Sequence, residues 1–189
     1  MSTNDEQLLI EAYKKIYENQ IGKGNHFEAT LIGPNKVRKT PISGETIPND
    51  EYEKLKFMLD NQGPDKPFIR IWDLTSDWVE TEEVQLVISD LYDFSSWFIE
   101  ETNDGDELSD NLLKFFSNKS NWKDNLESME SYKKFLIQSG DTGSDVHVLN
   151  HIISLFKRML NVKNWPEPLD IHAHNIGVTN DRKLVIFDM

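Results

Sequence analysis

The stretch Asp170-Ile-His-Ala-His-Asn-Ile-Gly-Val178, followed by Leu184-Val-Ile-Phe-Asp188, decides how the chain is interpreted. Asp170 and Asn175 are five positions apart, and Asp188 ends a short apolar run. Polar residues at 179–182 separate two apolar segments, which is the pattern of two strands joined by a turn. We therefore expect a strand, a turn and a second strand, with polar side chains at the strand ends.

This stretch resembles the catalytic loop and metal-binding segment of the protein-kinase-like superfamily. Its D-x-H-x-x-N pattern is closer to aminoglycoside and choline phosphotransferases than to protein kinases, which usually carry lysine where His172 stands. The resemblance implies that Asp170 is the catalytic base and that His172 lies near the transferred phosphoryl group. It also implies that Asn175 and Asp188 bind Mg²⁺. The alternative is a chance arrangement of these residue types in a loop between two strands.

A segment with two glycines, Ile21-Gly-Lys-Gly-Asn-His-Phe27, comes before an expected hairpin. Glycine allows the backbone to approach a phosphate closely. The resemblance therefore implies that Gly22 and Gly24 form the phosphate loop. The third glycine of the kinase motif is replaced by Phe27, as in some atypical kinases, so the loop departs from the pattern that wraps phosphates tightly.

The second expected strand of the hairpin carries a V-x-K pattern. Val37 and Lys39 face the same side, because strand side chains alternate. The resemblance implies that Lys39 holds the nucleotide phosphates and pairs with a glutamate from the next helix, expected over 50–62. Glu53 is our preferred candidate over Glu51. The alternatives are that Lys39 is an ordinary edge-strand lysine and that the glutamates are solvated.

Five strands are expected in the first half of the chain, at 21–25, 27–33, 36–41, 67–74 and 78–83, after an N-terminal helix at 4–19. Residues 85–160 have the spacing of helices, including Trp122–Ile137 and Val146–Leu160. The expected fold class is α+β and bilobal. It comprises a kinase-like N-lobe at 1–84 with a five-stranded sheet, and a shortened, mainly helical C-lobe at 85–189. The resemblance makes Glu82–Val84, with Glu83 at its centre, the hinge that binds adenine.

Composition limits the function classes. The 189 residues carry a net charge of −13 and contain no cysteine. The acidic charge argues against direct nucleic-acid binding, and the lack of cysteine excludes disulfides and thiolate metal sites. No apolar run is long enough for a membrane span, so we expect a cytoplasmic protein that does not bind membranes. The charge either keeps the protein in solution or attracts a basic partner.

Zinc bound by Asp170, His172 and His174 is a weaker alternative to the kinase-like site, because no fourth ligand is evident.

The chain stops one residue after Asp188, where kinase-like proteins normally continue. We expect a fragment, a shortened module with rearranged helices, or a C-lobe covered by a protein partner or a second copy.

Two functions follow from these patterns. The first is an ATP- and Mg²⁺-dependent phosphotransferase that acts on a hydroxyl of a protein or small molecule. The second is a kinase-like acidic protein, catalytically weak or inactive and of the kind expected from a phage or mobile element, that inhibits or regulates a host protein.

Overall fold

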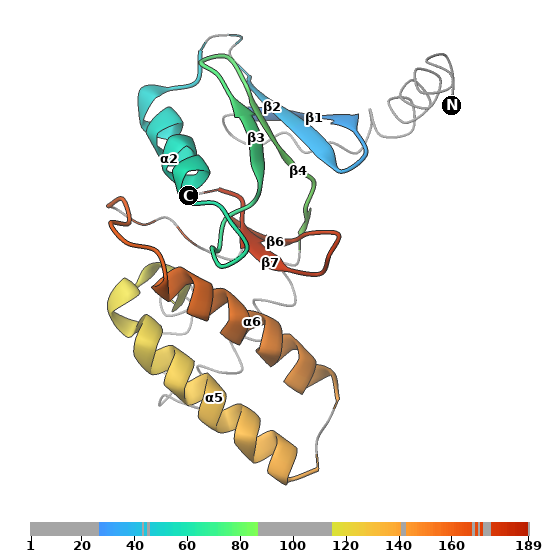
Figure 1. Cartoon of the computed structure of the whole chain (residues 1–189), viewed down its shortest axis with the longest axis vertical. Coiled ribbons are helices and arrows are strands. Elements are labelled where there is room, and N and C mark those ends of the chain that lie inside the picture. Colours follow the sequence, from blue (N-terminus) through green and yellow to red (C-terminus); the bar gives the residue numbers. More distant parts are fainter. Residues whose placement is uncertain are drawn as a thin grey trace. The chain divides into compact units, whose positions relative to one another are not determined.

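The computed structural model describes residues 27–42, 44, 46–86, 115–140, 143–167, 169, 171 and 175–188. This part of the chain is α+β, with a four-stranded sheet, a three-stranded sheet and helices (Figure 1). It divides into two units. Residues 27–62 and 69–84 form the first unit, and residues 63–68 pack with the later part of the chain in the second.

The sheet of the first unit is antiparallel, with strand order β1-β2-β4-β3. Strands β1 (Phe27–Gly33) and β2 (Lys36–Pro41) form the expected hairpin. Asn35 in its turn has a φ of 60°, a left-handed conformation that asparagine tolerates better than most residues. The sheet is completed by β3 (Ile71–Leu74) and β4 (Val79–Glu82). The fifth expected strand, at 21–25, lies outside the described residues.

The strand expected at 67–74 is shorter in the structure, because only Ile71–Leu74 belongs to the four-stranded sheet. Phe68 instead forms a parallel bridge with Ile186 of the second unit. Phe68 and Ile69 are both buried, with 4% and 1% of their surfaces exposed. A half-buried strand buries alternate residues, so two consecutive buried residues mark the point where the chain leaves one sheet for the other.

Helix α2 (Asn49–Asp60) corresponds to the helix expected at 50–62. Its N-cap residue is Pro48, and no side-chain cap hydrogen bond forms at its start. Asp50 and Glu51 lie in the first turn, where negative charge is favoured by the helix dipole. Leu55 and Met58 are its buried residues, and the helix packs beside β3 (Figure 1).

The second unit contains an antiparallel sheet with strand order β5-β6-β7. Its strands are β5 (Gln85–Leu86), β6 (Ile176–Val178) and β7 (Leu184–Ile186). The register Ile176↔Ile186 and Val178↔Leu184 confirms the predicted strand, turn and strand.

The helices whose bounds lie within the described part of this unit are η1 (Lys119–Asn121), α5 (Trp122–Gln138) and α6 (Ser144–Leu160). The two long helices agree with the predicted Trp122–Ile137 and Val146–Leu160, and they lie side by side (Figure 1). The helix expected at 4–19 and most of the two expected within 85–116 fall outside the described residues. No helix in the described part of the chain is both long and apolar enough to cross a membrane.

Aromatic side chains form the core between the helices of the second unit. Trp122 is fully buried, and its Nε1 donates a hydrogen bond to the Phe116 carbonyl at 2.6 Å. Its ring packs edge-on against Trp165, with centroids 5.2 Å apart, and Trp165 in turn contacts Phe68 at the same distance. Phe156 of α6 is also fully buried. The rings of Trp122, Trp165 and Phe68 thus connect α5 to residues 63–68.

Candidate functional site

The β6–β7 pair holds the two expected metal ligands close together in the backbone. Asn175 comes immediately before β6, and Asp188 follows β7 by two residues. The Phe187 N–H donates a hydrogen bond to the Asn175 carbonyl at 2.9 Å, one residue beyond the paired strands. Asn175 therefore lies opposite Phe187, the residue next to Asp188 in the sequence. The Asn175 residue is buried, and Asp188 is half-buried.

The turn between these strands is closed by hydrogen bonds of Thr179. The Thr179 N–H donates to the Lys183 carbonyl at 3.0 Å, and the Thr179 hydroxyl donates to the same carbonyl at 3.1 Å. That hydroxyl also contacts the Asp181 carboxylate. Thr179 is only 4% exposed, so the turn is anchored by a buried polar side chain whose bonds are satisfied inside the turn.

A buried arginine joins β7 to helix α6. Nη2 of Arg158 donates to the Leu184 carbonyl at 2.5 Å, and Nη1 donates to the Lys66 carbonyl at 3.0 Å. Burial lowers the pKa of Arg158 to about 10, and the nearby Asp181 opposes that shift. The guanidinium is therefore charged at neutral pH although only 7% of the residue is exposed. Its partners among these contacts are carbonyl oxygens, which a planar donor fork can satisfy together.

Residues 63–68 are held against both β7 and α6. The Ile186 N–H donates to the Pro67 carbonyl at 2.8 Å, and Lys183 Nζ donates to the Pro64 carbonyl at 2.8 Å. On the helix side, Lys66 Nζ donates to the Asn161 carbonyl at 2.7 Å. This segment therefore anchors the strand that leads to Asp188.

In the first unit, Val37 and Lys39 lie on the same face of the sheet, as expected. They pair with Thr81 and Val79 of β4, which are 2% and 0% exposed. This face is therefore covered, and Lys39 is half-buried on it.

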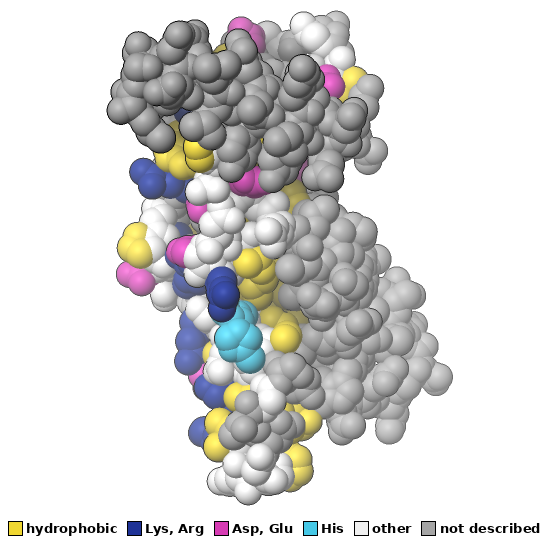
Figure 2. Space-filling model, turned by 90° about the vertical axis from the view of Figure 1, so that its right-hand side faces the viewer, with side chains coloured by type: hydrophobic (Ala, Val, Ile, Leu, Met, Phe, Trp, Pro, Cys, Tyr) yellow, Lys and Arg dark blue, Asp and Glu magenta, His cyan; other side chains and the backbone are white. Residues whose placement is uncertain are grey.

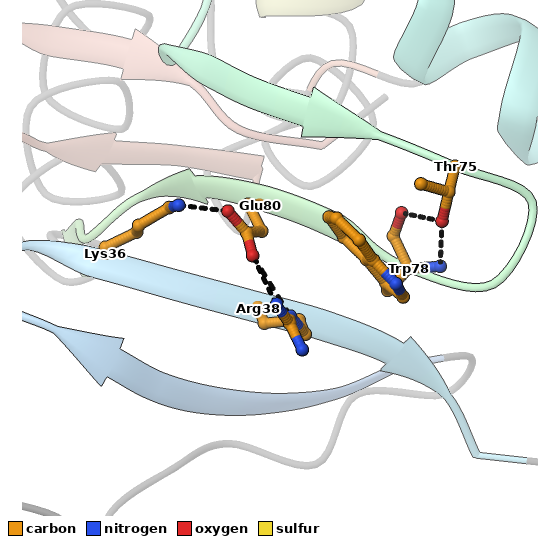
Figure 3. Close-up of polar contacts among 5 residues, drawn as sticks. All are labelled: Lys36, Arg38, Thr75, Trp78 and Glu80. Atoms are coloured by element: carbon orange, nitrogen blue, oxygen red, sulfur yellow. Dashed lines mark hydrogen bonds and ion pairs between the residues drawn. The ribbon is translucent and has the colours of Figure 1, made fainter.

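The opposite face carries an ion cluster around Glu80 that the sequence reasoning missed. Glu80 forms ion pairs with Lys36 and Arg38, and Arg38 Nη2 is 2.5 Å from its Oε1 (Figure 3). The hydrogen bond from Lys36, and then that from Arg38, holds the Glu80 pKa below its ordinary value. The Arg38 guanidinium also lies 4.4 Å from the centre of the Trp78 ring, within cation–π range. The available signal was the alternation of Lys36 and Arg38 along one strand, with an acidic residue, Glu80, in another expected strand.

The candidate partners of Lys39 on α2 differ in burial. Glu53 is exposed, whereas Glu51 lies one turn before the buried Leu55, and its side chain is 18% exposed. Glu51 accepts a hydrogen bond from Lys54 at 3.3 Å. The structure thus puts Glu51, and not the preferred Glu53, beside the buried face of the helix.

The backbone N–H of Glu83, in the expected hinge, already donates a hydrogen bond within the protein. Its N–H bonds to the Asn35 carbonyl at 3.0 Å, in the turn of the β1–β2 hairpin. An adenine at this segment would need the Val84 N–H or a backbone carbonyl instead.

Four of the predicted site residues lie outside the described residues: Gly22, Gly24, Asp170 and His172. Ile171, between the last two in sequence, is fully buried. Among the described residues, no group of three or more His, Asp or Glu side chains forms a metal site. The predicted site residues that the structure describes are Val37, Lys39, Glu51, Glu53 and Glu83 in the first unit, and Asn175 and Asp188 in the second.

Comparison with known proteins adds a weak likeness. No protein-family description matches the sequence, and no curated protein matches it. One solved structure with a similar chain trace is that of the streptomycin-ATP-APH(2")-IIa ternary complex. The match has 15% identity and a TM-score of 0.32, and it covers 94% of this chain and 69% of that chain. A likeness at this level does not assign fold or function.

Proposed function

We propose that this protein is a kinase-like phosphotransferase that uses ATP and Mg²⁺ and acts on a hydroxyl group of a protein or small molecule. The observation that carries the proposal is the hydrogen bond between Phe187 N–H and the Asn175 carbonyl. It brings Asn175 and Asp188, which carry an amide and a carboxylate, to the same end of a strand pair. Oxygen ligands of this kind are the ones that Mg²⁺ takes, with waters and phosphates completing its shell.

The burial of the two candidate ligands supports this assignment. Asn175 is buried and Asp188 is half-buried, so neither is an ordinary surface side chain. Bound Mg²⁺ with ATP would supply the phosphoryl group and neutralise charge on it. Asp170 would accept the proton of the attacking hydroxyl, and His172 would lie near the transferred group. Lys39, Gly22 and Gly24 would hold the phosphates.

Thermal unfolding with ATP, with Mg²⁺ and with both tests this proposal. A ligand that binds only the folded state stabilises it by about 2.7 kcal/mol at a hundredfold excess over Kd. We expect a clear rise in Tm that needs both ligands. The rise should be lost in Asp188→Asn and kept in Asp65→Asn, which makes the same change at an exposed position of the same unit. No shift at millimolar nucleotide, or equal shifts in both variants, would reject it.

A second candidate function is a non-catalytic, kinase-like protein that binds a protein partner or a second copy of itself. The favouring observation is the apolar C-terminal end of α5, where Phe135 is 61% exposed and Ile137 is 49% exposed. Exposed apolar area of this kind marks interaction surfaces. This function predicts that Asp170→Asn and Asp188→Ala leave the biological effect intact. Loss of the effect in a folded Asp188→Ala variant would reject it.

A further inference from the structure

Two histidines on helix α6 face each other at the surface. His147 and His151 are four residues apart, so they lie on one side of the helix. Their Nε2 atoms are 3.1 Å apart, and their rings meet at 84°. His147 is exposed and His151 is half-buried, so the pair can be reached from solvent. The histidines appear together on the face drawn in Figure 2.

The facing nitrogens are close enough to share one bridging proton or metal ion. Each Nε2 of a neutral imidazole is either an acceptor or a donor, according to the tautomer. Two lone pairs at 3.1 Å repel each other unless a proton or a metal ion lies between them. Burial lowers the pKa of His151, and the neighbouring charges of His147 and Arg182 lower it further. The lowered pKa favours the neutral ring of His151, and neutral imidazole is the state that binds metals.

We propose that His147 and His151 together bind a divalent transition-metal ion through their Nε2 atoms. With metal–nitrogen distances of about 2.0–2.1 Å, nitrogens 3.1 Å apart subtend an angle of about 95–102° at the metal. That angle lies between the octahedral and tetrahedral values. Imidazole nitrogen suits Ni²⁺, Cu²⁺ and Zn²⁺ and does not suit Mg²⁺ or Ca²⁺.

Water molecules can complete the shell of this ion. Among the described residues no third His, Asp or Glu joins the pair, so these residues supply two protein ligands. It also differs chemically from the oxygen ligands Asn175 and Asp188. The histidine pair therefore provides a metal site that is separate from the proposed phosphotransfer chemistry and does not depend on it.

Calorimetric titration of the full chain with Ni²⁺ at pH 7.5 tests the site. We expect saturable binding at one ion per chain, with Mg²⁺ giving no competing signal. His147→Ala and His151→Ala should each abolish that binding. His26→Ala and the double variant His172→Ala with His174→Ala should keep it, which excludes the other three histidines of the chain. A thermal melt of each variant verifies that it is folded.

Two further measurements sharpen the test. Protons compete with the ion for both Nε2 atoms, so affinity should fall as the pH is lowered, by up to about 100-fold per pH unit in acid. Arg182 has a φ of 62°, which glycine adopts without strain, so Arg182→Gly removes a nearby positive charge and should tighten Ni²⁺ binding. Absence of Ni²⁺ binding, or binding that persists in folded His147→Ala and His151→Ala, would overturn the proposal. Binding lost only with His172 and His174 would also overturn it.

Discussion

Nη2 of Arg158 donates a 2.5 Å hydrogen bond to the carbonyl of Leu184, and this contact ties helix α6 to the strand that leads to Asp188. The same guanidinium reaches the Lys66 carbonyl through Nη1 and the Ser154 carbonyl through Nε. One buried cation thus satisfies backbone acceptors from a helix, a loop and a strand. Such acceptors would be costly to leave unpaired in the core.

Arg158→Met should destabilise the protein by about 2–4 kcal/mol, because buried carbonyls lose a charged donor. Arg158→Lys should recover only part of this loss, since an ammonium lacks the planar fork. Urea unfolding measures both changes. The control is Lys157→Met on the same helix. Lys157 pairs with Glu130 at 2.6 Å but is 55% exposed, so its loss should cost at most about 1 kcal/mol. Equal effects of Arg158→Met and Lys157→Met would contradict the assigned role.

Glu80 should make stability depend on pH in the acid range. Its pKa is held below the ordinary value by Lys36 and Arg38, so the folded state binds the proton less readily than the unfolded chain. The resulting stability is present above the unfolded pKa and is lost as pH falls through the folded pKa. Glu80→Gln should cost about 1–3 kcal/mol near pH 7, and the difference from wild type should shrink toward pH 3. Chemical unfolding at several pH values measures this, and a constant difference would count against it.

Two phenylalanines with opposite burial offer a matched test of the helical core. Phe156 is fully buried, whereas Phe135 is 61% exposed. Phe156→Ala should destabilise by about 3–5 kcal/mol, because it leaves a cavity among packed rings. Phe135→Ala should stay within about 0.5 kcal/mol, as for most surface changes. Thermal unfolding of the pair measures both effects. A large effect of Phe135→Ala would mean that its exposed ring is covered in solution.

Asp170→Asn separates catalysis from binding under the proposed function. A general base contributes about 10²–10⁴ to rate, so phosphoryl transfer should fall at least a hundredfold. The ATP- and Mg²⁺-dependent rise in Tm should persist, because Asp170 is not a proposed metal ligand. Transfer is followed with labelled ATP and a panel of hydroxyl acceptors. Undiminished transfer in the variant would remove Asp170 from the base role.

Local sequence pattern predicted the elements whose formation depends on near neighbours. The hairpin at 27–41 and the pair at 176–186 follow from alternation interrupted by turn residues, and α5 and α6 follow from helical spacing. The same patterns could not show that β3 begins at Ile71, because the change at Phe68 depends on Ile186, which is far away in sequence. Nor could they decide between Glu51 and Glu53, since the buried face of α2 is set by what packs on it.

The sequence by itself determined the β1–β2 hairpin, the β6–β7 pair, the helices α5 and α6, and the alternation that puts Val37 and Lys39 on one face; it did not predict strand β5, because residues 85–160 have the spacing of helices. Only the tertiary structure decided that Arg158 bonds to Leu184 and that Glu80 forms ion pairs with two cations. It also decided that Asn175 lies opposite Phe187, next to Asp188. The physical reason is the separation along the sequence over which each interaction acts. Backbone propensity and side-chain period act over a few residues, whereas buried hydrogen bonds and ion pairs join residues that only the folded chain brings together.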